Sequence, residues 1–136
     1  MTRESTNFGN SNTMLIWTPD SYIFVSGTNQ SIVSAEVSVI PIGTIAGKSS
    51  ISKEVAAAFN AISKTEGLKS ISLTSMGTQI EAYNMSDVLK AIESAHRAVK
   101  STGAKRIISI VHIDERLDEP KTLDDKIKSV KEKLQK

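Results

Sequence analysis

The clearest hydrophobic pattern of the chain lies between Val33 and Thr44, which reads VSAEVSVIPIGT. Valine and alanine alternate with serine and Glu36, and this period of two predicts a strand with one apolar and one polar face. Pro41 has no N–H to donate and is expected to end the hydrogen-bonded ladder, and Gly43 permits a turn. The polar face and the serine-rich loop after the strand are where we expect a ligand.

Three later segments repeat apolar residues at helical spacing. The first helix is expected to be capped at its start by Ser49, Ser50 or Ser52 and to end at Gly67. The second is expected to open with Asn84 and Asp87 in an N-cap-like spacing and to end at Gly103. The third is expected to start at Thr122, with Asp125 three residues on. Their apolar stripes are Val55, Phe59 and Ile62; Val88, Ile92, Ala95 and Val99; and Leu123, Ile127, Val130 and Leu134.

Alternating patterns predict three further strands, at 71–74, 78–83 and 106–114. The resulting order, β-α-β-β-α-β-α, predicts an α+β protein with a ferredoxin-like βαββαβ sandwich and an additional C-terminal helix. Helices then cover one face of the sheet. The other face is expected to carry Glu36, Ser38, Thr74, Gln79 and Glu81. Because the last strand is apolar on both sides, we expect the third helix or another subunit to cover it, and we favour self-association.

Residues 1–31 differ from the rest and are predicted to be a flexible N-terminal extension before a ferredoxin-like domain at 32–136. The first twelve residues are polar and have little to bury. Met14–Trp17 and Tyr22–Val25 are short apolar runs that could add an edge strand or bind a neighbouring subunit. A turn at Pro19-Asp20 interrupts any secretory signal.

Composition narrows the classes of function. A chain of 136 residues fits one domain, and the formal net charge of +2 with interleaved signs does not favour nucleic acid or acidic lipid. The chain contains no cysteine, which excludes thiolate chemistry and agrees with a cytoplasmic location. No apolar run approaches the ~18 residues of a membrane span, so no membrane insertion is expected.

Five segments resemble one known family, the thiamine-binding-protein-like (YkoF-like) proteins. The segments are Val39–Thr44 (VIPIGT), Met76–Ala82 (MGTQIEA), Ala95–Val99 (AHRAV), His112–Arg116 (HIDER) and Asp125–Leu134 (DKIKSVKEKL). The resemblance covers residues 32–134 and implies a small ferredoxin-like protein that assembles as a homotetramer. Some members bind thiamine or its pyrimidine moiety. The chain is therefore expected to be a non-enzymatic small-molecule binding protein, a carrier or sensor in thiamine metabolism.

Thiamine presents an aminopyrimidine and a cationic thiazolium, and a carboxylate suits either part. Glu36 and Glu81 project from strands onto the polar face, and the resemblance implies that they share a pocket. The expected ligand-binding residues are Glu36, Ser38, Gly43, Thr44, Met76, Gly77, Thr78 and Glu81. The alternative is that both glutamates are solvated or form ion pairs across a subunit boundary.

The segment Gly43–Ser49 resembles a phosphate loop but has three residues between its glycines where the pattern needs four. A weaker hypothesis is that Lys48 and Ser49, at the start of a helix, bind an anion. The alternative function is then an oligomeric regulatory protein that binds a small anion or a phosphate ester.

Other chemistry has less support. His96 and His112 lie on different elements without a third ligand, so neither a metal nor a cofactor is expected. An acylphosphatase-like hydrolase would need an arginine beside the Gly43 loop, whereas Arg106 and Arg116 lie at the ends of the last strand. Binding of RNA would need aromatic residues on the central strands, and those strands carry glutamates instead.

Overall fold

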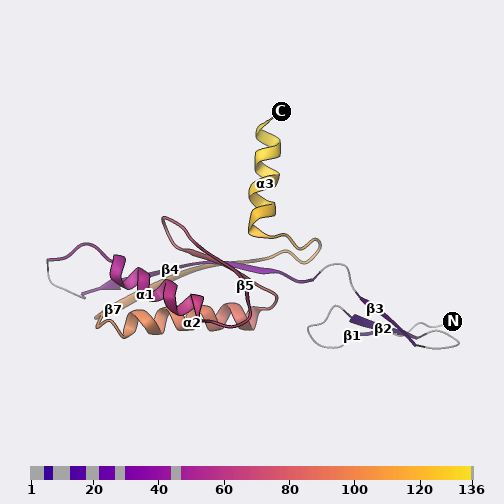
Figure 1. Ribbon diagram of the computed structural model, residues 1–136, viewed down its shortest axis with the longest axis horizontal. Coiled ribbons are helices and arrows are strands. Elements are labelled where there is room, and N and C mark those ends of the chain that lie inside the picture. The colour runs from indigo at the N-terminus through magenta and orange to yellow at the C-terminus, as the bar shows by residue number, and fades with distance from the viewer. Residues whose placement is uncertain (1–4, 8–12, 18–21, 27–29, 44–46, 136) are drawn as a thin grey trace.

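The computed structural model describes residues 5–7, 13–17, 22–26, 30–43 and 47–135. The alternating segment forms β4 (Val33–Ile42), which lies inside a four-stranded antiparallel sheet of order β5-β6-β4-β7. The other elements are α1 (Ser52–Ser63), β5 (Leu68–Leu73), β6 (Thr78–Ala82), α2 (Met85–Lys100), β7 (Arg106–Glu115) and α3 (Leu123–Leu134). Helices α1 and α2 cover one face, and α3 stands away from the opposite face (Figure 1). The ferredoxin-like prediction is confirmed.

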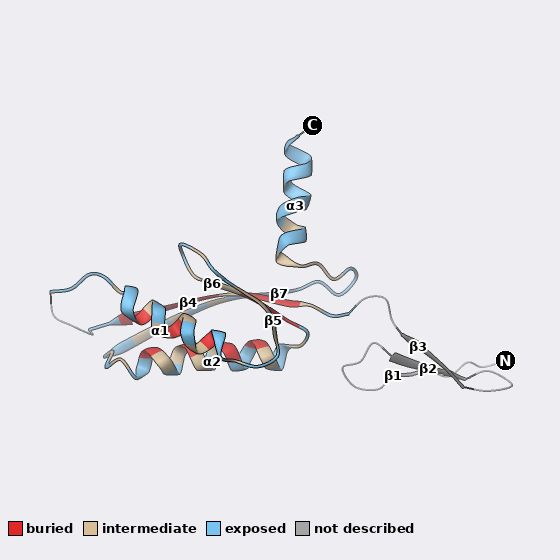
Figure 2. Ribbon diagram, viewed as in Figure 1, coloured by how far each residue is buried: buried red, intermediate tan, exposed pale blue. Residues whose placement is uncertain are grey.

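The alternation of β4 places its valines and Ala35 in the core, where Ile80 and Ala82 of β6 lie beside them. Helix α2 contributes Val88, Ala91, Ala95 and Val99, so that Ala91 is buried while the predicted Ile92 is half-buried. Helix α1 buries Glu54, Ala58 and Ile62. Val55 and Phe59 lie half-buried on its flank, contrary to the prediction, because the small side chain of Ala58 allows the helix to approach on a different face. Figure 2 shows this buried layer between the helices and the sheet.

The predicted caps of two helices are confirmed. The side chain of Asn84 accepts a hydrogen bond of 2.8 Å from the backbone N–H of Asp87. Thr122 and Asp125 form a reciprocal capping box, with distances of 3.0 and 3.1 Å. The serine cap of α1 is wrong, because Ile51 precedes the helix and no side chain caps it.

Two predicted ends also shift. Helix α1 stops at Ser63, and Gly67 lies further on, in the turn before β5, at a φ of +87°. Pro41 does not end β4, which continues to Ile42 with Pro41 opposite Ile107 of β7. Pairing with β6 stops at Val37, so one side of β4 carries no ladder there and tolerates the missing N–H.

The N-terminal apolar runs form strands of their own. β1 (Ser5–Asn7), β2 (Thr13–Trp17) and β3 (Tyr22–Ser26) pair in a separate antiparallel sheet. Among the described residues, none of these strands joins the edge of the larger sheet. The polar residues 1–4 and 8–12 lie outside the described part of the chain, and the flexible extension stays a prediction.

Candidate functional site

The open face of the sheet, opposite α1 and α2, has two chemically different halves. Register on this face aligns Ile42 with Arg106, Ile40 with Ile108 and Ser38 with Ile110. The next two rows are Ser72, Gln79, Glu36 and His112, and then Ser70, Glu81, Ser34 and Asp114. We call the four isoleucines Ile40, Ile42, Ile108 and Ile110 the apolar half, and these last two rows the polar half.

Glu36 is the central carboxylate of the polar half. It lies on β4 between Gln79 on β6 and His112 on β7. The amide nitrogen Nε2 of Gln79 donates a hydrogen bond of 3.1 Å to Oε2 of Glu36. This bond fixes the carboxylate on the open face and leaves it half-buried, with acceptor capacity remaining.

A groove of about 240 Å³ lies over this half of the sheet. Its lining comes from the three strands β4, β6 and β7 and from the start of α3: Ser34, Ala35, Glu36, Gln79, His112, Ile113, Asp114, Leu123 and Lys126. Two carboxylates and one lysine give the lining a formal charge of −1 with neutral histidine. The groove therefore favours a neutral or cationic ligand over an anion.

Ser34 contributes a buried hydroxyl to this groove. The residue is 3% exposed, and its hydroxyl has no hydrogen-bond partner in the described structure. A buried hydroxyl without a partner is unfavourable by about 1–3 kcal/mol, because it has lost water and gained nothing. A ligand that bonds to this hydroxyl would recover that loss.

Glu81 has a different environment from Glu36. It is 4% exposed, its Oε1 accepts a hydrogen bond of 2.5 Å from Oγ of Ser70, and its Oε2 accepts one of 3.2 Å from the backbone N–H of Leu123. Leu123 is the first residue of α3, where an anion is favoured by the helix dipole. The carboxylate of Glu81 thus holds the start of α3 against the sheet.

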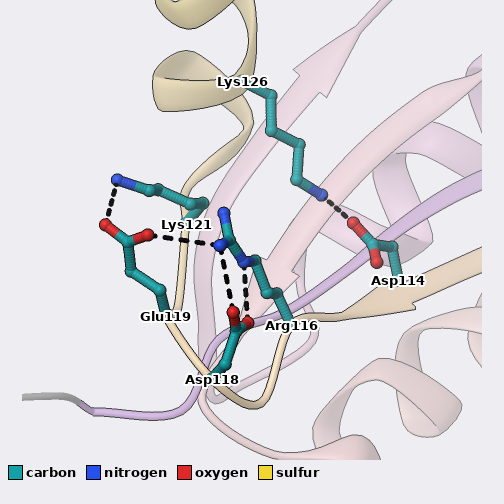
Figure 3. A network of polar contacts seen from close by, with 6 residues as sticks. All are labelled: Asp114, Arg116, Asp118, Glu119, Lys121 and Lys126. Carbon is teal, nitrogen blue, oxygen red and sulfur yellow. Dashed lines mark hydrogen bonds and ion pairs between the residues drawn. The ribbon is translucent and has the colours of Figure 1, made fainter.

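Ion pairs brace the connector between β7 and α3 (Figure 3). Arg116 forms a bidentate pair with Asp118, at 2.7 and 3.1 Å, and also contacts Glu119. The Arg116 guanidinium lowers the pKa of Asp118 to about 2. Lys121 pairs with Glu119 and lowers the pKa of that carboxyl in turn.

Lys126 pairs with Asp114 and so joins α3 directly to the polar half. In the structure Asp114 bonds to α3, Arg116 bonds within the connector, and His112 lines the groove.

The structure brings together only some of the predicted ligand residues. Glu36 lines the groove, and Glu81 and Ser38 occupy the rows beside it. Gly77 lies under Glu36, and a Cβ there would be 2.9 Å from the carbonyl oxygen of Val37.

The others lie apart from the groove. Thr78 is buried on the helix-covered face, opposite Val37, and Met76 is 83% exposed in the turn between β5 and β6. Gly43 follows the far end of β4, and Thr44 lies outside the described residues. Lys48 and Ser49 line a separate groove of about 400 Å³ beside α1, where buried Glu54 also contributes.

Several lining residues were not predicted as ligand contacts. The alternation of β4 already placed Ser34 on the polar face, and Gln79 was assigned to that face without a binding role. Leu123 and Lys126 carried no signal, because their position depends on how the connector turns α3 back to the sheet.

The described residues contain neither a metal-binding cluster nor a membrane-spanning helix. No cluster of three or more His, Asp or Glu side chains is placed to hold a metal ion in that part of the chain. None of its helices combines the length and the hydropathy that a membrane span requires.

Comparisons with known proteins place this architecture in a family. The family model described as "Thiamine-binding protein" matches residues 35–131. A UPF0045 protein of Methanothermobacter thermautotrophicus is 40% identical over 103 residues, which cover 76% of this chain and 100% of that protein. A UPF0045 protein of Methanocaldococcus jannaschii is 38% identical over 100 residues, covering 74% of this chain and 93% of its own.

Solved structures agree. A crystal structure of the Methanocaldococcus jannaschii protein superposes with a TM-score of 0.64 at 37% identity, over 74% of this chain and 97% of that one. A Thermotoga maritima protein, described as a candidate for thiamine biosynthesis or salvage, has a TM-score of 0.57 over 73% of this chain and 98% of its own. At 18% identity that likeness supports the fold alone.

The matched range begins one residue after Ser34 and extends into α3, so it contains the four-stranded sheet apart from Val33 and Ser34, and the groove lining apart from Ser34. The chain belongs to the thiamine-binding protein family.

Proposed function

We propose that the chain binds the aminopyrimidine group of thiamine, or free hydroxymethylpyrimidine, in the groove over the polar half. The observation that carries this proposal is that one groove holds two polar groups with free bonding capacity. The Glu36 carboxylate accepts a single hydrogen bond, from Gln79, among the described residues, and the buried Ser34 hydroxyl has no partner there. The family match supports the class of ligand.

The chemistry of an aminopyrimidine fits these two groups. Its exocyclic amine donates hydrogen bonds, and the adjacent ring nitrogen accepts one. Glu36 accepts from the amine, and the Ser34 hydroxyl donates to the ring nitrogen. A hydrogen bond to a charged group contributes about 1.5–3 kcal/mol.

The volume and the charge of the groove indicate which part of thiamine it can hold. Sites for drug-sized ligands usually enclose about 300–1,000 Å³, and this groove has about 240 Å³. It therefore suits one ring. The thiazolium would remain at the rim, where the net charge of the lining favours a cation.

As a physiological role we propose a carrier or sensor of this ligand that acts as a homotetramer without catalysing a reaction. The alternative ligand, a phosphate ester at Lys48 and Ser49, has less support. Lys48, Lys53 and Glu54 give the lining of that groove a formal charge of +1, which suits an anion, but the family match supports a thiamine-like ligand rather than a phosphate ester.

Titration calorimetry with hydroxymethylpyrimidine and thiamine tests the proposal. Glu36→Gln keeps the shape of the side chain and removes its charge, so we expect a roughly ten- to hundredfold weaker affinity for both ligands. Glu66→Gln, at an exposed position in the turn after α1, is the matched control and should bind as the wild type does. A wild-type protein with no heat of binding and no thermal shift at millimolar ligand would remove the proposal.

A further inference from the structure

Helix α1 has a second apolar surface besides the one that packs on the sheet. Ala58 and Ile62 are buried in the core, whereas Val55 and Phe59 lie half-buried on the flank of the helix. There they line a groove of about 640 Å³, which we call the α1 groove. Its lining is Ser49, Ser50, Ile51, Ser52, Val55, Ala56, Phe59 and Leu73. The volume lies within the roughly 300–1,000 Å³ of ordinary ligand sites, whose walls are also mostly apolar.

The open side of the α1 groove exposes apolar side chains to water. Leu73 is the last residue of β5, at the edge of the sheet, and is 60% exposed. Ile51, Val55 and Phe59 are each half-buried. An apolar molecule that covers these side chains would remove them from water, which is favourable.

The apolar groove continues into a charged one. Ser49, Ser50 and Ser52 line both the α1 groove and the groove of about 400 Å³ that holds Lys48 and Lys53, which we call the lysine groove. The hydroxyl oxygens of Ser50 and Ser52 lie 3.1 Å apart at this junction. One surface of the chain therefore joins an apolar part to a charged part.

The lysine groove suits a group with a single negative charge. Lys48, Lys53 and Glu54 give its lining a formal charge of +1, and neither lysine forms an ion pair within the described residues. A carboxylate balances that charge and accepts charge-assisted hydrogen bonds from lysine. A phosphate monoester carries about −1.5 to −2 at pH 7, and its excess charge would be repelled by the buried carboxylate of Glu54.

The start of α1 adds hydrogen-bond donors to the same end. No side chain caps the helix, and the backbone N–H of Ser52 has only a long contact of 3.5 Å with Oγ of Ser50. The amide N–H groups of a first helical turn lack partners within the helix and favour an anion. These donors support the lysines in holding a carboxylate.

We infer that the two grooves together bind one free amphiphile, a medium-chain carboxylate. Its apolar tail lies in the α1 groove, and its carboxylate lies beside Lys48 and Lys53. This site shares no residue with the groove over the polar half. The inference is therefore independent of the proposed function.

Titration calorimetry with hexanoate, octanoate and decanoate, each below its micelle concentration, tests the tail. Burial of one methylene strengthens binding about threefold to fourfold, so each step of two methylenes should strengthen the affinity roughly tenfold. Acetate should give no heat of binding. An affinity that does not change with chain length would overturn the inference, and so would a wild type that binds anionic phosphatidylglycerol vesicles but not free decanoate.

A charge placed in the α1 groove tests its location. Ala56 is exposed on α1, so Ala56→Glu should fold, as circular dichroism will check. It brings a carboxylate against the tail and should weaken decanoate binding about tenfold or more. Asn60→Glu adds the same charge at an exposed position of α1 that lines neither groove and should bind as the wild type does. Equal affinities of the two variants would overturn the inference.

Removal of the lysine charges tests the head. Lys48→Gln combined with Lys53→Gln should weaken decanoate binding roughly tenfold and leave the binding of neutral decanol unchanged. Lys64→Gln, at the other end of α1, is the control and should bind both as the wild type does. Decyl phosphate should bind the wild type more weakly than decanoate. An equal loss of decanol and decanoate in the double variant would contradict a carboxylate at the lysines.

The two proposals fail separately, because their sites share no residue. Ala56→Glu should keep the wild-type affinity for hydroxymethylpyrimidine, and decanoate should not compete with that ligand. If decanoate displaces hydroxymethylpyrimidine, the two grooves of α1 are not a separate site and the inference is wrong. If decanoate binds as expected and hydroxymethylpyrimidine does not bind at all, the inference holds and the proposed function is wrong.

Discussion

Glu36 and Glu81 illustrate how neighbours assign different roles to similar residues. Both are strand glutamates on the same face, and both project toward the polar half. Glu81 is almost fully enclosed and bonds to Ser70 and to the start of α3, whereas Glu36 is held by Gln79 alone among its described polar contacts and lines the groove. Glu81 is therefore suited to a structural role and Glu36 to ligand binding.

Residue 77 must be glycine because the backbone of β4 leaves no room for a Cβ there. A Cβ at this position would lie 2.9 Å from the carbonyl oxygen of Val37 and 3.3 Å from Cγ of Glu36. Gly77→Ala must therefore displace β4 from the start of β6. We expect the free energy of unfolding in urea to fall by about 1–3 kcal/mol, the range for overpacking. Ser75→Ala, exposed in the same turn, should leave the unfolding midpoint unchanged, and a Gly77→Ala protein as stable as this control would contradict the steric account.

At the scale of elements, α3 is held by its first turn and its connector rather than by a core. The capping box fixes the backbone at Thr122, Glu81 accepts from Leu123, and Lys126 reaches Asp114. The Lys126–Asp114 ion pair is partly open to solvent and contributes little, whereas Glu81 is buried. The start of α3 is therefore fixed mainly by its capping box and by the Leu123–Glu81 hydrogen bond, and the rest of the helix buries no residue.

The Arg116–Asp118 ion pair of the connector should make the stability of the protein depend on pH below about 4. The Arg116 guanidinium lowers the pKa of Asp118 from 3.8 to about 2, so the folded state favours the charged carboxylate. Its contribution to stability is present above the unfolded pKa and is lost as pH falls from about 4 through 2. In a carboxyl-carbon NMR titration, Asp118 should have its midpoint near 2, and Arg116→Gln should return the midpoint toward 3.8. A wild-type midpoint at the ordinary value would contradict the ion pair in Figure 3.

The sequence predicted elements well where periodicity decides them. The alternation of β4, the caps at Asn84 and Thr122, and the order of strands and helices all follow from local patterns. The start of α1 was missed because three serines offered caps and the chain used none of them. Pro41 was read as a stop because the sequence does not show that β6 ends at Val37.

The candidate site was less predictable than the fold, for a related reason. The polar face of β4 indicated Glu36, but the groove also needs a wall from α3, some ninety residues later in the chain. That wall depends on the contacts of Leu123 and Lys126 with the sheet, which no spacing reveals. Of the predicted residues in loops, Gly43 follows the far end of β4, and Met76 is exposed in the turn between β5 and β6 and does not line the groove.

At the scale of the whole molecule, the open face of the sheet combines a polar and an apolar surface. Its polar half contains the Ser34 hydroxyl, which has no hydrogen-bond partner among the described residues, and its apolar half exposes isoleucine side chains. Because the halves share the border between Ser38 and Glu36, a copy that covers one half would shape the other. This arrangement would link assembly to ligand binding.

Ligand binding in the groove is tested most directly by a map of backbone amide NMR shifts during titration with hydroxymethylpyrimidine. We expect the largest shifts on the polar half and at the start of α3, over residues 34–36, 79, 112–114 and 123–126. Those shifts should disappear in Glu36→Gln. Shifts confined to residues 47–54, or to the outer surfaces of α1 and α2, would show that the ligand binds elsewhere and would contradict a site on the polar half.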